Sequence, residues 1–361
     1  MKTGDGPAKR NNPVKKTMRK IVRSTVLLSV FFLFFSACAK RVQYEQFTLN
    51  GRTMGTTFSI KIVTPKNAGA VQEQIDEQIY ALLDTVNSIM STYIETSDIS
   101  MFNAYAGTDT FKVSPELVYV VKMANHISDL SGGAFDITIG PMVNLWGFGA
   151  ESRNITIPPE IEIQEKLALV GYKKLSCSQT PPALSKQVPQ LYCDLAGIAK
   201  GYGVDEVADF IESKGYQNYL VEIGGEIRTR GINQSGRKWR VGISSPVNNA
   251  GIQKVVEVND SGMATSGDYR NYFEKDGVRY SHTIDPRNGR PITHKLASVT
   301  VLHDTCMVAD AMATAISVLG PEIGYEFALK QNLLAFMIVK DENGFVEKMT
   351  PGFEKLISVP R

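Results

Sequence analysis

The sequence predicts an α+β fold, built as one large domain. Segments with apolar residues at helical spacing alternate along the 361 residues with short segments of strand-like alternation. Short hairpin turns join most of the strand-like segments and no regular strand–helix–strand unit repeats, which favours mixed or antiparallel sheets with flanking helices. After residue 47 the chain shows no internal repeat and no linker of disordered composition. We therefore expect residues 47–361 to form a single domain.

The first third of this domain is expected to contain a strand pair and two helices. Strand-like segments flank Asn50-Gly51, a dipeptide typical of tight turns. Apolar residues recur every three or four positions over residues 71–89 and predict a long amphipathic helix. A second helix should begin after Ser114, an N-cap residue followed by proline, and should end at Gly132-Gly133.

The middle of the domain is expected to alternate between short elements. Residues 134–148 are predicted to form a loop that is rich in aromatic residues. A short helix should follow over residues 164–170, then a hairpin or loop excursion over residues 175–192, then a helix after Gly203 that ends near Gly215. Three strands are predicted next, over residues 219–223, 239–243 and 255–258.

The last part of the domain is expected to open with a hairpin over residues 272–280 that turns at Asp276-Gly277. A strand over residues 297–302 and an apolar helix over residues 305–319 should follow. The remaining predicted elements are a helix over residues 322–329, a strand over residues 334–339 and a turn at Asn343-Gly344.

The segment 193–205 combines a glycine-bearing turn with the start of a helix. Gly197, Gly201 and Gly203 have no Cβ and would let the backbone approach a bulky ligand closely. Free N–H groups at a helix start, with Lys200 beside them, favour a bound phosphate. The alternative is a glycine-containing turn into a surface helix, on which Lys200 is only solvated.

The apolar helix over residues 305–319 carries one polar stripe. Asp310, Thr314 and Ser317 lie at spacings that place them on one face. A carboxylate in such a helix is costly unless it meets a cation or hydrogen-bond donors. Asp310 and Thr314 offer only oxygen ligands, which favours Mg²⁺. The alternative is a structural Asp310 that pairs with an arginine.

The first 37 residues are expected to be an export signal. A basic stretch precedes the apolar run 26–35, which is too short to span a bilayer comfortably. The run ends in Phe35-Ser36-Ala37-Cys38, which resembles the lipobox of bacterial lipoproteins, where the cysteine is lipidated and becomes the mature N-terminus. Residues 38–46 would then form a lipidated tether, and a start at Met18 would give a more usual signal. A short membrane anchor with an incidental cysteine is the alternative.

Charge and cysteine content argue against two other kinds of site. A net charge of +2 gives no general field that would favour nucleic acid. Cys177, Cys193 and Cys306 show no CxxC spacing, so we expect no zinc site. Cys177 and Cys193 flank a proline-rich loop and could form a disulfide in an oxidising compartment, or stay free. Cys306 is expected to pack as a small hydrophobic residue.

A series of short motifs occurs in a fixed order between roughly residue 50 and residue 320. They are Met54-Gly55-Thr56-Thr57, Met90-Ser91-Thr92-Tyr93, Gly132-Gly133-Ala134-Phe135-Asp136, Trp146-Gly147-Phe148, residues 194–205, Gly224-Gly225-Glu226, Ala264-Thr265-Ser266-Gly267, His282-Thr283-Ile284-Asp285-Pro286 and Ala309-Asp310-Ala311-Met312-Ala313-Thr314. In this order they resemble the motifs of the FAD:protein FMN transferases, the ApbE family. The chain departs from the family's commonest residues at Ala196, Gly203, Glu222 and Glu226.

The resemblance implies a T-fold-like architecture with a site for FAD and Mg²⁺. It implies that Gly197 gives a backbone carbonyl to the metal, beside Asp310 and Thr314. It also implies that His282 assists the transfer, although a lone histidine beside a proline turn is more often structural. The residues implied to hold FAD are Met54, Tyr93, Ala134, Phe135, Asp136, Asp194, Lys200 and Ile284.

The activity implied by the resemblance is transfer of FMN from FAD to a Ser/Thr hydroxyl of a partner protein, through a phosphoester bond. AMP would be released and Mg²⁺ would be required. The implied partners are extracytoplasmic segments of redox-pump subunits or similar flavin carriers, met by a lipid-anchored protein of the bacterial envelope that faces the periplasm or another extracytoplasmic space. A Mg²⁺-dependent FAD pyrophosphatase and a non-catalytic FAD-binding lipoprotein are the alternatives. The sequence leaves open the acceptor protein, the membrane, the oligomeric state and the proton acceptor.

Overall fold

The computed structural model describes residues 1, 3–4, 6, 18, 42–67, 71, 73–150, 157–246, 251–267, 272–275, 277–342 and 344–358. Contacts along the chain separate Met1–Gln43 from Tyr44–Arg361, and the fold below belongs to the second of these units. Cys38 and the apolar run expected to be an export signal lie outside the described residues.

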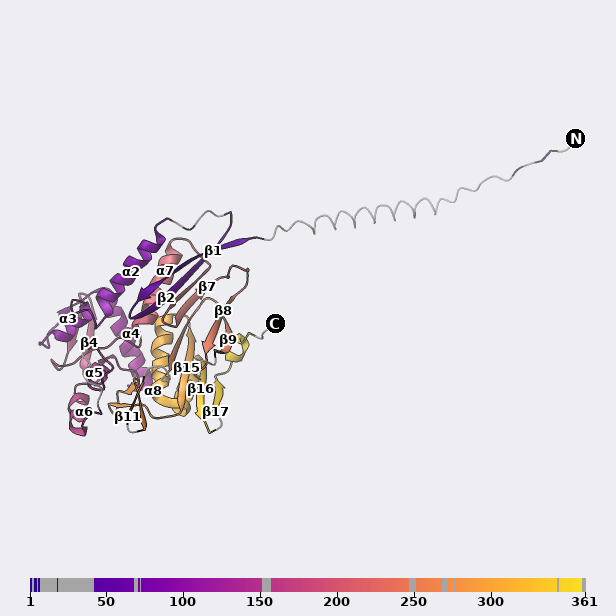
Figure 1. The fold of residues 1–361 in the computed structure, drawn as a ribbon. Coiled ribbons are helices and arrows are strands. Elements are labelled where there is room, and N and C mark those ends of the chain that lie inside the picture. Colours follow the sequence, from indigo (N-terminus) through magenta and orange to yellow (C-terminus); the bar gives the residue numbers. More distant parts are fainter. Residues whose placement is uncertain are drawn as a thin grey trace. The chain divides into compact units, whose positions relative to one another are not determined.

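An eight-stranded antiparallel sheet forms the centre of this unit (Figure 1). Its strand order is β1-β2-β6-β7-β10-β15-β16-β17, so neighbours in the sheet are often distant in the sequence. The strands are β1 (Tyr44–Thr53), β2 (Thr56–Pro65), β6 (Tyr219–Ile223), β7 (Glu226–Arg230), β10 (Ser261–Gly267), β15 (Leu296–His303), β16 (Leu334–Asp341) and β17 (Gly344–Met349).

Helices cover one face of the sheet, and a two-stranded ribbon covers the other. Helices α7 (Ala199–Ser213) and α8 (Cys306–Lys330) contact the central strands, and α2 (Ile75–Met90) packs on α7. On this face Val221 of β6 joins the apolar cluster of α2 and α7, whereas the next residue back, Leu220, joins the cluster of the opposite face. That alternation is the expected signature of a strand buried on both sides. The opposite face carries the ribbon of β8 (Trp239–Ser244) and β9 (Ile252–Val258).

The remaining elements surround the helical face or close the chain. The helices are α3 (Asp98–Ala104), α4 (Pro115–Ser131), α5 (Gly140–Leu145) and α6 (Glu160–Leu167), with the 3₁₀ turns η1 (Ile137–Ile139), η2 (Tyr172–Lys174) and η3 (Phe353–Leu356). The small sheets contain β3 (Phe111–Lys112), β4 (Leu175–Gln179), β5 (Pro182–Lys186), β11 (Tyr272–Lys275), β12 (Val278–Ser281), β13 (Ile284–Asp285) and β14 (Arg290–Pro291).

Helix α8 is long and apolar enough to cross a bilayer, but most of it is buried inside the domain. It joins the two helices predicted over residues 305–319 and 322–329. Gly320, at φ 82°, is the non-helical residue between them, and Pro321 follows it. The break therefore lies where the sequence placed it, and both segments serve as core helices.

The structure confirms the predicted α+β class and most of the predicted elements. Helix α4 begins and ends as expected: the Ser114 hydroxyl accepts a hydrogen bond from the Leu117 amide, and Gly132 closes the helix in the left-handed region at φ 62°. The predicted hairpins over residues 175–192 and 272–280 form β4–β5 and β11–β12.

The turn between the first two strands was predicted at the wrong dipeptide. Asn50 and Gly51 lie inside β1, paired with Ser59 and Phe58, and the turn is formed by Met54 and Gly55. Gly51 is required there for packing, because a Cβ would lie 2.5 Å from the Phe58 ring. A glycine that makes room for an aromatic ring was mistaken for a glycine that makes a turn.

Three other boundaries differ from the prediction. Residues 134–148 contain η1 and α5 where the sequence predicted a loop, and their aromatic side chains serve as core. Helix α7 begins at Ala199, so Gly201 and Gly203 are helical residues rather than parts of the turn. The short helix expected over residues 164–170 starts earlier, at Glu160. Helix α3 and the strands β7 and β10 of the large sheet were not predicted.

Candidate functional site

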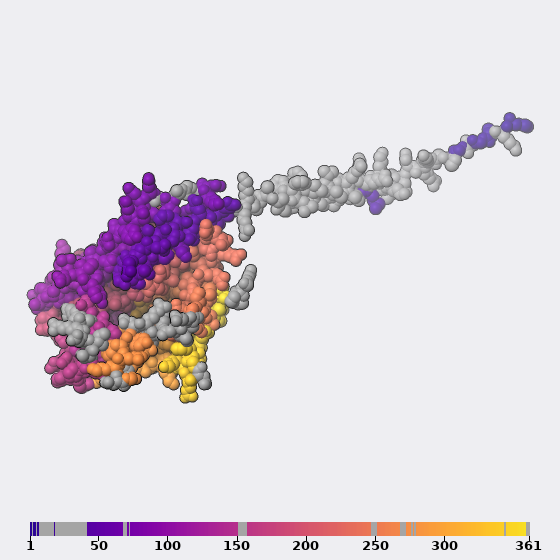
Figure 2. All heavy atoms as spheres, viewed as in Figure 1, coloured from indigo at the N-terminus to yellow at the C-terminus, as the bar shows by residue number. Residues whose placement is uncertain are grey.

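A cleft of about 780 Å³ lies where the β1–β2 turn, the C-terminal end of α2, the start of α7, the middle of α8 and the start of β13 meet. Figure 2 shows the purple N-terminal segments and the orange segments around residues 272–285 on the same face of the molecule. Residues from the whole length of the domain line the cleft. Those predicted from the sequence are Met54, Tyr93, Ala134, Phe135, Asp136, Asp194, Gly197, Lys200, His282, Ile284 and Thr314.

Met54 reaches the cleft because it occupies a strained turn position. Its backbone φ of 48° lies in the left-handed region, which residues other than glycine, asparagine and aspartate rarely adopt. The methionine side chain packs against Gly203 of α7, where an added Cβ would lie 2.7 Å from the Met54 methyl. The tight turn therefore places a thioether on the cleft wall, and Gly203 leaves room for it.

The floor of the cleft is apolar and close-packed. Ala134 and Phe135 are buried, with 1% and 4% of their surfaces exposed. Gly197 lies directly against Phe135 and Thr314, because a Cβ there would be 3.2 Å from the Phe135 ring and 3.1 Å from the Thr314 hydroxyl. Ile284, with 5% of its surface exposed, adds another apolar contact. A flat ligand ring would therefore meet aliphatic and aromatic carbon on this side.

Tyr93 lies at the rim and is 74% exposed. Its segment is nevertheless well held, since the hydroxyls of Ser97 and Ser100 both donate to the Ser91 carbonyl. The Tyr93 amide in turn donates to the Ser91 hydroxyl. An exposed aromatic side chain on a fixed backbone is suited to cover a ligand ring.

The two acids expected to hold FAD are engaged inside the protein. Asp136 accepts hydrogen bonds from the Thr138 amide and hydroxyl and from the Tyr172 amide, at 2.7 to 2.8 Å. Asp194 accepts from the Ala196 amide. Burial raises the pKa of both carboxyls, and these hydrogen bonds only partly offset it. Asp136 thus shapes the cleft through the turn that it caps, and Asp194 retains one oxygen that no described residue hydrogen-bonds.

His282 follows β12 and lines the cleft. The Ser281 hydroxyl accepts from the Thr283 amide and fixes the turn that presents the imidazole. Phe148 lies edge-on to the imidazole, with ring centres 6.3 Å apart. Phe148 also contacts Phe273, which stacks on Tyr280, so the hairpin β11–β12 is anchored by aromatic packing.

Lys200, on the first turn of α7, forms an ion pair with Glu226, which in the sequence stands out only as a departure from the family's commonest residue. The Lys200 ammonium lies 2.7 Å from Glu226 Oε1, at the start of β7. Burial raises the pKa of Glu226 to about 7, against the opposing effect of Lys200. Burial also disfavours the charge of Lys200, but Asp310 and Glu226 outweigh it and raise the pKa of the ammonium.

Asp310 lies behind the cleft wall rather than on it. Only 6% of its surface is exposed, and its Oδ2 accepts a hydrogen bond of 3.1 Å from the Gly201 amide, on the first turn of α7. Among the described residues no donor reaches its other oxygen. Burial raises the pKa of Asp310, although Lys200 and the Gly201 amide oppose the rise.

Asp205 of α7 bonds the start of α8, just as Asp310 of α8 bonds the start of α7. No role was predicted for Asp205 from the sequence. Its two oxygens accept from the amides of Cys306 and Met307, the first residues of α8, at 3.0 and 2.9 Å. Neither α7 nor α8 has a side-chain cap from its own N-cap residue. Each helix is therefore capped by an aspartate of the other, which fixes α7 against α8.

Gly201 makes this reciprocal capping sterically feasible. A Cβ there would lie 2.5 Å from the Cys306 carbonyl oxygen, closer than such atoms pack. The one sequence signal for Asp205 was its position, four residues after Gly201 and on the same face of the helix. A carboxylate on a buried helical face needs partners, and here those partners are helix amides.

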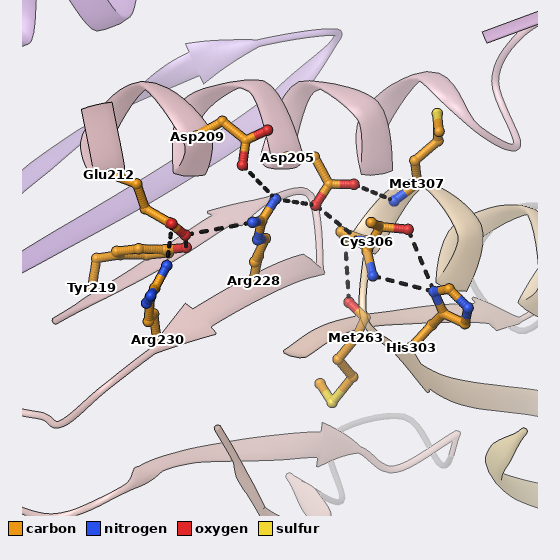
Figure 3. Close-up of polar contacts among 11 residues, drawn as sticks. Asp205, Asp209, Glu212, Tyr219, Arg228, Arg230, Met263, His303, Cys306 and Met307 are labelled. Carbon is orange, nitrogen blue, oxygen red and sulfur yellow. Dashed lines mark hydrogen bonds and ion pairs between the residues drawn. The ribbon is translucent and has the colours of Figure 1, made fainter. Parts of the chain in front are cut away.

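Arg228 of β7 completes the surroundings of Asp205 (Figure 3). The guanidinium lies 3.1 Å from Asp205 and 2.9 Å from Asp209, and it also contacts Glu212. Glu212 bonds the Tyr219 hydroxyl and Arg230. This network ties α7 to the sheet beneath the junction of the two helices.

The oxygen atoms of Gly197, Asp310 and Thr314 are ligands that fit a hard divalent cation. Thr314 Oγ1 lies close to Gly197, and Asp310 precedes Thr314 by one helical turn. The set contains a hydroxyl, a carboxylate oxygen without a hydrogen-bond donor among the described residues, and a backbone carbonyl. Within the described ranges no three His, Cys, Asp or Glu side chains come together as a metal cluster.

Two other sequence expectations are resolved. Cys177 and Cys193 are free thiols, so the pairing that had been left open is not formed, and Cys306 is buried as expected. Glu222, one of the departures from the family's commonest residues, accepts a hydrogen bond from the Gly225 amide and stabilises the β6–β7 turn.

Comparison with known proteins identifies the relatives of the chain. The model of the ApbE family matches residues 54–338. The FAD:protein FMN transferase of Vibrio cholerae is 44% identical over 338 residues, which cover 93% of this chain and all of the relative. That of Escherichia coli K12 is 38% identical and covers 92% of this chain and 97% of the relative.

Solved structures give the same grouping. The flavin transferase ApbE from Vibrio cholerae superposes with a TM-score of 0.81 at 44% identity, over 87% of this chain and 99% of that structure. The apo form of the Pseudomonas stutzeri flavinyl transferase ApbE gives a TM-score of 0.81 at 39% identity, over 88% and 99%.

Proposed function

The chain belongs to the ApbE family, and from this premise we propose the chemistry that its cleft carries out. The protein is an FAD:protein FMN transferase, an enzyme that moves FMN from FAD to a protein. We propose that the acceptor is a Ser/Thr hydroxyl, that the bond formed is a phosphoester, that Mg²⁺ is required and that AMP is the product released.

The composition of the cleft supports this proposal. Its lining includes Lys200, the oxygen atoms of Gly197 and Thr314, the His282 imidazole and an apolar floor. A pyrophosphate beside the polar groups and a flavin ring against the floor would both find suitable partners. The volume of about 780 Å³ falls in the usual range of small-molecule sites.

In the proposed reaction the acceptor hydroxyl oxygen attacks the phosphorus of the FMN half. The bond from that phosphorus to the bridging oxygen breaks, and AMP leaves with the bridging oxygen. His282 is the candidate to accept the hydroxyl proton, because an imidazole has a suitable pKa near neutrality. Lys200 would bind the pyrophosphate and offset its charge. Gly197, Asp310 and Thr314 would hold Mg²⁺, which when bound neutralises phosphate charge.

Release of AMP tests the proposed reaction. The purified protein is incubated with FAD and Mg²⁺, with and without an acceptor peptide, and AMP is measured by chromatography. AMP that appears only with the acceptor supports transfer. AMP that appears regardless of acceptor would indicate a pyrophosphatase, and its absence would indicate a protein that only binds FAD.

The acceptor itself is proposed by class only. We propose an extracytoplasmic segment of a redox-pump subunit or a similar flavin carrier. Mass spectrometry of a co-expressed candidate should show one added FMN on a serine or threonine, and a Ser/Thr→Ala change at that residue should remove it.

We further propose that the flavin ring lies between Tyr93 and the floor of the cleft. Tyr93→Ala should weaken FAD binding by about tenfold, the usual value of one aromatic contact. Flavin fluorescence titration measures the affinity. Tyr119→Ala is the matched control, because Tyr119 is also exposed but does not line the cleft. Equal affinities for the Tyr93 variant and wild type would place the ring elsewhere.

The location of the protein is also proposed from its sequence. We propose that Cys38 is acylated and becomes the mature N-terminus, which anchors the protein in the bacterial envelope facing an extracytoplasmic space. A palmitate analogue should label the wild-type protein and leave Cys38→Ala unlabelled. Labelling retained in the variant would exclude this anchor.

A further inference from the structure

We propose that Glu226 holds the Lys200 ammonium away from Asp310, and that it thereby keeps the Asp310 carboxylate open to a divalent cation. The inference rests on the Mg²⁺ dependence proposed above and adds a positioning residue to it. It assigns a purpose to a buried glutamate that neither lines the cleft nor belongs to the proposed metal ligands.

Lys200 has two buried carboxylates within electrostatic range, but it makes an ion pair with one of them. Its ammonium lies 2.7 Å from Glu226 Oε1. Among the described residues, no ion pair joins Lys200 to Asp310, although the charge of Asp310 acts on Lys200. The structure therefore pairs Lys200 with Glu226 and not with Asp310, which is the proposed metal ligand.

Glu226 has little else to do at its position. It is 3% exposed, and its second oxygen, Oε2, is buried without a hydrogen-bond partner among the described residues. Two other acids nearby, the buried Asp205 and the half-buried Glu222, differ because they bond backbone amides. Burying a carboxylate costs free energy. The ion pair with Lys200 is therefore the best explanation for a buried glutamate at this position.

The position of Glu226 is fixed by the turn before it. Gly224 and Gly225 adopt positive φ values of 60° and 103°, and Ile223 pairs with Glu226 across the turn. Lys200 is held on the first turn of α7. The lysine side chain between these fixed points is long and flexible, so its ammonium goes to whichever carboxylate binds it best.

Loss of the Glu226 charge would change that choice. A contact ion pair in a buried site is several times stronger than one in water, so Lys200 would move to the oxygen of Asp310 that now lacks a donor. A divalent cation would then have to displace the ammonium before it could bind. Glu226→Gln should therefore weaken cation binding even though residue 226 is not a ligand.

The test measures metal binding in the absence of FAD and of any acceptor. Mn²⁺ is the probe, because electron paramagnetic resonance reports its free concentration directly, and the Mg²⁺-dependent rise of the thermal midpoint gives a second reading. Measurements are made at pH 8, above the pKa of Glu226 of about 7. We expect Glu226→Gln to bind Mn²⁺ about tenfold more weakly than wild type, as a lost supporting residue typically does.

Glu222→Gln is the control for charge alone. Glu222 also lies within electrostatic range of Lys200, but it makes no ion pair with it among the described residues, and its bond to the Gly225 amide survives as glutamine. We expect its Mn²⁺ affinity to stay within about twofold of wild type, because a charge without contact acts weakly. A loss equal to that of Glu226→Gln would overturn the proposed contact mechanism.

A double variant separates displacement of Lys200 from a general field effect. In the Lys200→Met background, Glu226→Gln should no longer weaken Mn²⁺ binding, because there is no ammonium left to reach Asp310. A loss of about tenfold that persists in this background would overturn the inference. Lys200→Met alone should change Mn²⁺ affinity by less than about threefold, and a tenfold gain would mean that Lys200 already occupies Asp310.

Mn²⁺ binding by wild type and by Glu226→Gln distinguishes an error in the role of Glu226 from an error in the proposed metal dependence. If wild type binds Mn²⁺ and Glu226→Gln binds it equally well, the inference is wrong and the metal dependence stands. If wild type shows neither Mn²⁺ binding nor a Mg²⁺-dependent midpoint, both are wrong.

Discussion

Asp205 and Asp310 occupy equivalent positions in the α7–α8 junction but differ in how fully their oxygens are used. Each caps the helix that the other belongs to. Asp205 bonds two backbone amides and Arg228, so both of its oxygens are bonded. Asp310 bonds one amide through one oxygen, and Lys200 is paired elsewhere.

The difference separates a scaffold acid from an acid kept available for chemistry. A carboxylate with both oxygens bonded offers little to a ligand, whereas one with an unbonded oxygen offers a ready site. The same local device, an aspartate that caps a neighbouring helix, thus serves stability at one end of the junction. At the other end it is combined with a proposed metal site.

Asp310→Asn tests the second half of this comparison and has the largest expected effect. Asparagine can still accept from the Gly201 amide, so the variant should fold. It should lose the Mg²⁺-dependent rise of the thermal midpoint and release AMP at least about 10²-fold more slowly, because a lost ligand costs more than a lost supporting residue. Wild-type AMP release at limiting Mg²⁺ would show that other residues hold the metal.

Asp205→Ala tests the first half. It removes two helix-cap hydrogen bonds and leaves Arg228 without its most buried partner. We expect a loss of about 3 kcal/mol in the free energy of unfolding, measured by urea denaturation. Asp209→Ala removes a 64% exposed partner of the same arginine and should cost less than about 1 kcal/mol. Equal losses would mean that the capping bonds contribute little.

Two glycines of α7 sharpen the comparison with a smaller effect. Gly201→Ala places a methyl group 2.5 Å from the Cys306 carbonyl oxygen and should destabilise the protein by about 2 kcal/mol, because backbone atoms cannot give way cheaply. Gly203→Ala meets only the flexible end of Met54, so the helix propensity of alanine should leave stability unchanged or about 0.5 kcal/mol higher. Thermal unfolding of both variants decides, and equal midpoints would contradict a close α7–α8 contact at Gly201.

The sequence was informative wherever a signal was local. The N-cap Ser114 and the closing Gly132 defined α4 at both ends, and the apolar periodicity of residues 71–89 located α2. The candidate site residues were predicted from their motifs, and apart from Asp310 and the undescribed Cys38 they all line one cleft. Linear motifs carry such information because each is a short segment that meets the ligand directly.

Prediction from the sequence failed for residues whose role depends on contact with a residue outside their local segment. Gly51 resembles a turn residue until Phe58 is placed against it, and Asp205 has no visible purpose until α8 arrives. Glu226 attracted notice only as a departure from the family's commonest residue, yet it binds Lys200. These are tertiary contacts, which local propensity and spacing do not encode.

The reciprocal caps also bear on the order in which the protein folds. Met307 and Asp205 are 102 residues apart in the chain, and Gly201 and Asp310 are 109 apart. Contacts of such long range each close a large loop, so we expect both caps to form when α8 docks rather than one helix at a time. A chain in which α8 has not docked would lack Asp310 and Thr314, two of the proposed metal ligands. We therefore expect Mg²⁺ to stabilise only the completed fold.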